Sequence, residues 1–179
     1  MYSHDKYKYA SDSDLNADII ELPYQGKNFS MVILLPQERS ALQGLVRSLS
    51  ASRVQSALSA LTEHELELTV PKLKLETKLS LVQPLSNLGA DSIFGPKANL
   101  SGISAANDLY VSDVLHKAVI EVNEEGSEAS AFTGVGGATL GFPAQRPPPV
   151  EVNVDHPFLF CVRHVKTNLI LFLGVVNAM

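Results

Sequence analysis

The sequence has few of the features that mark disulfide-rich and membrane-spanning proteins. Its 179 residues include a single cysteine, Cys161, so no disulfide can form within the chain. That cysteine lies in an apolar run with a strand-like pattern, which predicts a buried core thiol rather than a reactive one. The longest strongly apolar run, Leu169 to Val176, is too short to cross a bilayer. We therefore expect no membrane partner.

Charge is also scarce, and its balance is slightly acidic. The chain has 14 Lys and Arg against 19 Asp and Glu, for a net charge of -5. No basic patch stands out, so nucleic acid is not an expected partner. The hydrophobic content of 45% is typical of a soluble globular domain, which limits the class of protein but not its function.

The sequence lacks the common catalytic and cofactor signatures. It has no Gly-x-Ser-x-Gly nucleophile elbow and no Walker pattern. Its five histidines are scattered, without the spacing of metal ligands. These absences predict that the protein is not an enzyme and that it has no metal site and no cofactor.

The first half of the chain has the apolar spacing of strands and then of helices. Strands are predicted over 15–23 and 29–36, and the second is apolar on both faces, as in a sheet covered on both sides. Helical spacing from Ser40 to Leu61 predicts two short helices, broken near Ser50 to Ser52. Apolar residues then occupy even positions from 66 to 70 and odd positions at 73 and 75, so a bulge or kink is expected at Pro71-Lys72.

The second half is predicted to be mostly strand. A short helix over 79–88 ends at Gly89, and a long strand covers 109–123. Further strands are predicted over 150–154 and over 158–162, the latter paired with 169–176. Neither an internal repeat nor a linker divides the chain.

The segment after Val122 is small, polar and poor in large apolar residues, so it should be mobile and exposed. Its residues of odd number are all small or β-branched: Ser127, Ala129, Ala131, Thr133 and Val135. The pattern therefore fits a flexible linker and also fits a loop that can serve as a strand.

The sequence motifs around this loop resemble those of a known family. Val122-Asn-Glu-Glu-Gly-Ser-Glu-Ala129 resembles the hinge of the serpins, which are suicide inhibitors of serine proteases. Other serpin-like motifs lie before and after it, in the family's order along the chain: Glu21-Leu-Pro-Tyr-Gln-Gly26, Ser30-Met-Val-Ile-Leu-Leu-Pro36, Val70-Pro-Lys-Leu73, Leu100-Ser-Gly-Ile103, Leu109 to Ala118, Asp155-His-Pro-Phe-Leu-Phe160 and Leu171-Phe-Leu-Gly174. Several motifs in order over nearly all of the chain are far more specific than any one alone.

The resemblance implies an α+β fold, a partial serpin fold of mainly antiparallel and mixed β-sheets with a few short helices and an exposed reactive-centre loop. Residues 1–179 would be the C-terminal portion of one serpin domain, with the loop at about 124–149 and the N-terminal half absent. Met1 then fits an internal methionine of a partial record better than the start of a genuine short product.

The resemblance also implies a mechanism and a partner. A serine protease cleaves the loop, the freed segment inserts as a strand in the main sheet, and the acylated protease is trapped. The hinge comprises Glu124, Glu125, Gly126, Ser127, Glu128, Ala129, Ser130 and Ala131. Lys72 would pair with Glu124 at the top of that sheet. His116 would have a gating role beneath the sheet. It occupies the same face of the predicted strand as the apolar residues, which predicts a hydrogen-bonded core histidine.

The cleaved bond is expected at Leu140-Gly141. Serpin spacing sets the recognition residue 14 positions after the hinge glycine, which leads from Gly126 to Leu140. Counting back from the C-terminal strand gives Arg146 instead. Both Phe142 and Arg146 precede proline, which crowds the nucleophile, whereas Leu140 precedes glycine. An apolar P1 residue implies a chymotrypsin-like or elastase-like target.

Localisation and ligands follow from the resemblance alone. It implies an extracellular, secreted protein, although the N-terminus of this chain carries no secretion signal. Asn28-Phe-Ser30 and Asn99-Leu-Ser101 are candidate glycosylation sites in that compartment. Binding of glycosaminoglycans is left open. A non-inhibitory carrier, chaperone or storage serpin, and an inactive truncated fragment, remain as alternatives.

Overall fold

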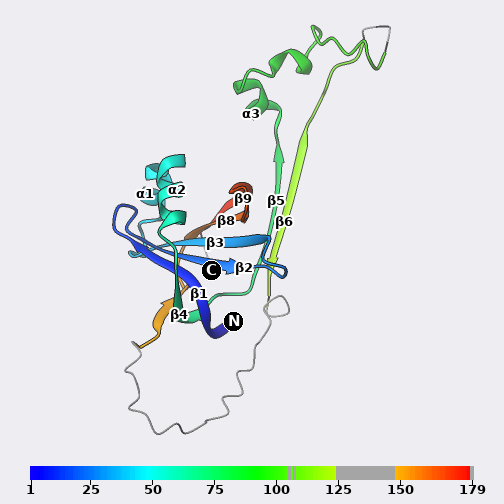
Figure 1. Cartoon of the computed structure of the whole chain (residues 1–179). Coiled ribbons are helices and arrows are strands. Elements are labelled where there is room, and N and C mark those ends of the chain that lie inside the picture. Colours follow the sequence, from blue (N-terminus) through cyan, green and yellow to red (C-terminus); the bar gives the residue numbers. More distant parts are fainter. Residues whose placement is uncertain (105, 107, 124–147, 178–179) are drawn as a thin grey trace, which may run out of the picture. The chain divides into compact units, whose positions relative to one another are not determined.

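The computed structural model describes residues 1–104, 106, 108–123 and 148–177. The chain divides into two compact units, one formed by Met1–Lys72 with Asn123–Met179 and the other by Leu73–Val122. Figure 1 labels the helices and strands of both units.

The first unit is built on a seven-stranded sheet in the order β7-β4-β1-β2-β3-β8-β9. All neighbours are antiparallel except β4 and β7, which are parallel. Its strands are β1 (Tyr2–Asp12), β2 (Ala17–Pro23), β3 (Phe29–Pro36), β4 (Thr62–Thr69), β7 (Val150–Asn153), β8 (Phe158–His164) and β9 (Leu169–Val176). The strands predicted over 15–23, 29–36, 150–154 and 158–162 are confirmed, as is the pairing of the last with 169–176.

Strand β1 joins the two parts of this sheet, and sequence reasoning missed it. Its residues from Tyr2 to Tyr9 pair with β4, while those from Lys8 to Asp12 pair with β2. It escaped detection because it contains no aliphatic residue larger than alanine. The alternation of Lys6, Tyr7, Lys8 and Tyr9 is the strand signal that was available, since Tyr7 and Tyr9 are half-buried while both lysines are exposed.

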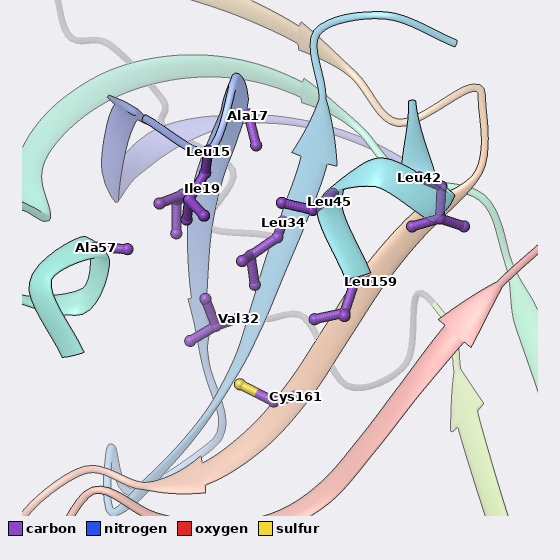
Figure 2. Close-up of a cluster of buried hydrophobic side chains, with 10 residues drawn as sticks. All are labelled: Leu15, Ala17, Ile19, Val32, Leu34, Leu42, Leu45, Ala57, Leu159 and Cys161. Carbon is purple, nitrogen blue, oxygen red and sulfur yellow. The ribbon is translucent and has the colours of Figure 1, made fainter. Parts of the chain in front are cut away.

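Two short helices, α1 (Leu42–Ser48) and α2 (Ala51–Ser59), connect β3 to β4. The predicted break lies at Leu49-Ser50, where the Ser50 side chain caps α2 by accepting a hydrogen bond from the Arg53 N–H at 3.3 Å. Helix α1 packs against β3 and β8. Figure 2 shows its Leu42 and Leu45 beside Leu34 and Leu159 of those strands.

This contact is part of the core beneath one face of the sheet. The core consists of buried, mostly apolar side chains: Leu15, Ala17, Ile19, Val32, Leu34, Leu42, Leu45, Ala57, Leu159 and Cys161 (Figure 2). The prediction that Cys161 is a core thiol is confirmed, since only 2% of the residue is exposed. Burial raises the pKa of its thiol, which keeps it protonated and unreactive.

The second unit contains β5 (Leu73–Ser80) paired antiparallel with β6 (Leu115–Val122), together with α3 (Val82–Asn87) and a 3-10 turn, η1 (Asp91–Phe94). The predicted stop at Gly89 is confirmed. Gly89 has a φ of 94°, its N–H donates to the Ser86 carbonyl, and the Ala90 N–H donates to the Leu85 carbonyl. This pair of hydrogen bonds is the Schellman motif, which ends a helix and favours glycine.

Two predicted elements differ in extent or nature. The expected kink at Pro71-Lys72 is a change of sheet, since β4 ends at Thr69 in one sheet and β5 begins at Leu73 in the other. The strand predicted over 109–123 begins at Leu115, because its partner β5 ends at Ser80, which pairs with Leu115. None of the described helices is long and apolar enough to span a membrane.

Candidate functional site

The β5–β6 pair leads directly into the predicted hinge. Leu73 pairs with Val122 at one end of the ladder, and Leu79 pairs with His116 near the other. Ion pairs link the strands, with Lys74 Nζ 3.7 Å from Glu121 and Lys117 Nζ 2.5 Å from Glu76. The ladder therefore fixes the register of the chain up to Val122, immediately before the hinge.

His116 lies on the predicted strand, but it is exposed rather than buried in a core. The prediction that His116 lies on the apolar face of the strand is correct, because it shares that face with Ala118, Ile120 and Val122, which are half-buried. The core prediction fails because a two-stranded ribbon does not bury a face by itself. No catalytic partner of His116 is found among the described residues, and its gating role stays a prediction.

Lys72 is an exposed residue at the junction between β4 and β5. It immediately precedes Leu73, whose ladder partner Val122 lies two residues before Glu124. Glu124 itself lies outside the described residues, as do the rest of the hinge from Glu125 to Ala131 and the bond Leu140-Gly141. The Lys72–Glu124 pair therefore stays a prediction with which the register of the ladder agrees.

The C-terminal root of the predicted loop is a well-anchored strand. Strand β7 begins at Val150 and runs parallel to β4, with Val152 opposite Leu68. Val152 and Val154 are 4% and 2% exposed, and the Val154 N–H donates to the Thr69 carbonyl at 2.8 Å. Backbone hydrogen bonds and apolar burial thus hold the chain as it leaves the loop.

A cluster of charged and polar groups continues this anchor. The Arg39 guanidinium pairs with the Asp155 carboxylate, and its Nη1 also reaches the Asp155 carbonyl. His156 Nδ1 lies 2.9 Å from Asp155 Oδ1, and its Nε2 lies 2.6 Å from the Pro36 carbonyl oxygen. The hydrogen bond from His156, followed by the contacts from Arg39, holds the pKa of the Asp155 carboxyl below its ordinary value.

A buried ion pair ties the hairpin β8–β9 to the middle of the sheet. Arg163 Nη2 lies 2.6 Å from Glu21 Oε1, which also accepts a 2.6 Å hydrogen bond from the Ser30 hydroxyl. Arg163 Nη1 donates to Asn168 Oδ1 in the hairpin turn at 2.5 Å, and Lys8 Nζ lies 3.3 Å from Glu21 Oε2. Burial alone would raise the pKa of Glu21, but these donors and positive charges lower it.

Among the described residues, no group of three or more His, Cys, Asp or Glu side chains could hold a metal ion. Each end of the predicted loop follows from a paired strand of its own unit, β6 on one side and β7 on the other.

Sequence comparison decides the family. The model of the family described as "Serpin (serine protease inhibitor)" matches residues 1–179. The chain belongs to the serpin family. The family is described as one of protease inhibitors and not of enzymes, which confirms the prediction that the protein is not an enzyme.

Relatives and solved structures agree with this assignment. The chain is 49% identical over 168 residues to Iripin-8 of Ixodes ricinus, covering 92% of this chain and 41% of that protein. It is 41% identical over 184 residues to a leukocyte elastase inhibitor of Bos taurus, covering 99% of this chain and 48% of that protein. The crystal structure of uncleaved ovalbumin matches with a TM-score of 0.83 at 31% identity, covering all of this chain and 44% of that one. The chain thus spans less than half the length of these relatives, and the predicted partial serpin fold is confirmed.

The serpin motifs occupy the elements that form the site. The motif Glu21 to Gly26 covers the end of β2 and the turn after it, and Ser30 to Pro36 is most of β3. Asp155 to Phe160 supplies both the charged cluster and the start of β8, while Leu171 to Gly174 lies in β9. Sequence reasoning identified these segments as motifs but missed the ion pair of Glu21 with Arg163, because the two residues are 142 positions apart.

Proposed function

We propose that this chain is the C-terminal portion of an inhibitory serpin whose loop, about 124–149, is presented to a serine protease as a substrate. The observation that carries the proposal is the hinge sequence, which is small and uncharged at the inward positions Ser127, Ala129 and Ala131 and follows a strand whose register is fixed to Val122. Membership of the serpin family and similarity to proteins named as inhibitors support it.

The proposed mechanism is a mechanical trap. The protease cleaves the loop and forms an acyl-enzyme, and the freed segment then inserts as a new strand of the main sheet, with His116 near the opening and Lys72 pairing with Glu124. Strain relief, new ladder hydrogen bonds and apolar burial drive insertion. Gly126 gives the backbone freedom that the hinge needs, and Ser127 and Ala129 fit under a closing sheet.

A non-inhibitory role as a carrier, chaperone or storage protein is the second candidate function. Non-inhibitory serpins tend to have charged or bulky residues at the inward hinge positions, where this chain has Ser127, Ala129 and Ala131. The hinge therefore favours inhibition. A chain limited to these 179 residues would be inactive, since the loop would lack the sheet into which it inserts.

The proposed reactive bond is Leu140-Gly141, and the proposed target has an apolar specificity pocket of the chymotrypsin or elastase type. The full-length protein that contains this chain should form a complex with such a protease that survives a denaturing gel. Mass spectrometry of the released C-terminal peptide should show Gly141 at its start. Trypsin should be a poorer target, because Arg146 is followed by Pro147.

The outcomes separate the alternatives. A released peptide that begins at Pro147, or a complex with trypsin alone, overturns the choice of Leu140 and leaves inhibition standing. Cleavage without any covalent complex, for every protease tested, favours the non-inhibitory alternative.

Secretion with glycosylation at Asn28 and Asn99 is part of the same proposal. Both side chains are exposed, and Asn99 lies in a loop where its Oδ1 accepts a hydrogen bond from the Ser101 N–H. The Ser30 hydroxyl of the first sequon is buried against Glu21, so its recognition would have to precede folding. Expression in secretory cells with N28Q and N99Q variants tests each site by loss of one glycan mass.

A further inference from the structure

Strands β3 and β8 are neighbours in the sheet, and their apolar residues do not define how the two strands align. Both strands are buried almost throughout, and both carry large apolar side chains on each face. A strand with one polar face resists slipping, because a slip moves polar side chains into the core. A strand that is apolar on both faces lacks this penalty. Another feature must therefore set the alignment of β8 on β3.

The alignment of β9 on β8 is set by shape. Gly174 lies opposite Phe160, and a Cβ on this glycine would be 2.7 Å from the ring. Glycine occurs once in β9, so a slip by one or two residues places a larger side chain opposite that ring, drawn from Phe172, Leu173, Val175 and Val176. This steric fit keeps β8 and β9 together as one hairpin.

A polar cluster joins that hairpin to the rest of the sheet. Arg163 of β8 lies opposite Ser30 of β3 in the ladder, and its Nη2 is 2.6 Å from Oε1 of Glu21 in β2. The Ser30 hydroxyl donates to the same carboxylate oxygen at 2.6 Å, and the three residues are at most 6% exposed. Arg163 Nη1 also donates to Asn168 in the hairpin turn. The arginine is thus held by its own hairpin and by a buried carboxylate of the sheet.

A slip of the hairpin along β3 would separate the two charges. A shift by one residue turns Arg163 to the opposite face of the sheet. A shift by two residues keeps every side chain of β8 on its face but moves Arg163 along β3 by about 7 Å, away from Glu21. Both charges would then stay buried without a partner, which destabilises a protein strongly. The cluster therefore penalises the slipped alignments that the apolar residues tolerate.

We propose that the buried pair of Glu21 and Arg163 is a register lock, which selects one alignment of the β8–β9 hairpin on β3. Apolar side chains can replace a buried ion pair without loss of stability, so the selection of one alignment is a separate role. Only residues 154–157 join β7 to β8, so the alignment of β8 also positions the C-terminal end of the predicted loop. That consequence rests on the proposed function, whereas the register lock does not.

Cys161 can report the alignment in the full-length protein that contains this chain. It lies opposite Val32, so Val32→Cys is placed to form a disulfide with Cys161 in the native alignment. Position 34 is a diagonal neighbour of Cys161, at a Cα separation of about 7–8 Å that a disulfide does not span. Leu34→Cys therefore reaches Cys161 only after a shift by two residues. Refolding with oxidised glutathione, followed by mass spectrometry of linked peptides, measures the fraction of each alignment.

With the ion pair intact, Leu34→Cys should form almost no disulfide with Cys161. The same reporter is then measured in the double variant Glu21→Leu with Arg163→Met, which removes both charges of the pair. In that variant the fraction linked between Leu34→Cys and Cys161 should rise at least about tenfold, because the slipped alignment no longer buries an unpaired charge.

An exposed ion pair of the same sheet is the matched control. Lys6 Nζ of β1 lies 3.3 Å from Glu63 Oε1 of β4, and both side chains are more than 60% exposed. Lys6→Met with Glu63→Leu makes the same exchange of charged for apolar side chains. It should leave the linked fraction at the wild-type value.

The outcomes decide the proposal without any protease. A linked fraction that does not change in the apolar double variant overturns the register lock, since the connections or the packing would then fix the alignment. Glu21→Met with Arg163→Leu repeats the measurement with the side-chain shapes exchanged. Failure of both versions to refold also overturns the lock, because the pair would then serve stability and not alignment. Either result leaves the proposed inhibition standing, and a protein that traps no protease leaves the lock standing.

Discussion

At the scale of single residues, the buried pair of Glu21 and Arg163 has the largest expected effect on stability. Arg163→Met should destabilise the protein by about 3–5 kcal/mol, because Glu21 would remain buried without its main partner. Arg47→Met on the exposed side of α1 should cost less than about 1 kcal/mol. Denaturant unfolding of the two variants compares these costs, and equal losses would contradict the role of the ion pair.

The same pair gives stability a dependence on acid pH. The pKa of Glu21 is lowered on folding, so the unfolded chain takes up the proton first as the pH falls below about 4.3. The contribution of Glu21 is therefore present above that value and is lost as the pH falls through its folded pKa. In Glu21→Gln the free energy of unfolding should fall less steeply with acid, and an unchanged slope would show that other carboxyl groups dominate.

Gly174 in β9 is a second residue with a sharp expectation. A Cβ at this position would lie 2.7 Å and 2.8 Å from ring carbons of Phe160, which is itself buried. Gly174→Ala should therefore cost about 1–3 kcal/mol through overpacking. Gly44→Ala is the matched control, because it lies in helix α1 with open space around it and should be neutral or stabilising. Thermal unfolding of both variants measures the difference.

At the scale of elements, the proposed inhibition depends on the segment after β6 that is predicted to be the reactive-centre loop. Ser127→Arg should convert an inhibitor into a substrate, because insertion would have to bury an unpaired charge at a cost of several kcal/mol. The ratio of cleaved protein to covalent complex should rise. Glu128→Arg is the control, since Glu128 has the opposite parity and should face solvent after insertion. A ratio unchanged by Ser127→Arg rules out the insertion mechanism for this chain.

At the scale of the whole molecule, strand β9 bears on how this chain behaves by itself. It is an edge strand without charge, and Leu169, Leu171, Phe172, Leu173 and Val175 are all more than 40% exposed. Such an edge favours strand pairing between molecules. The 179-residue chain expressed alone should self-associate at micromolar concentration, as measured by light scattering.

Leu173→Lys should reduce that association by adding a charge at a position that is 65% exposed. Leu88→Lys adds the same charge to a leucine that is 84% exposed outside β9, and it should have little effect. A chain that remains monomeric without either substitution would contradict the expectation.

The sequence by itself determined the family, most of the strands and the helix break. Alternating or continuous apolar runs such as those of β3 and β8 predict strands because local period decides which face is buried. The helix break at Ser50 and the stop at Gly89 follow from residues that act on their own backbone. The serpin motifs could be recognised in the sequence because each is a short contiguous segment.

Only the tertiary structure decided what depends on distant partners. The polar strand β1 exists because β2 and β4 complete its ladder, and the exposure of His116 follows from its position in a two-stranded ribbon. The pairing of Glu21 with Arg163, and of His156 with the Pro36 carbonyl, joins residues more than 100 positions apart. Local periodicity carries no information about such contacts, because they are set by how the strands come together in the sheet.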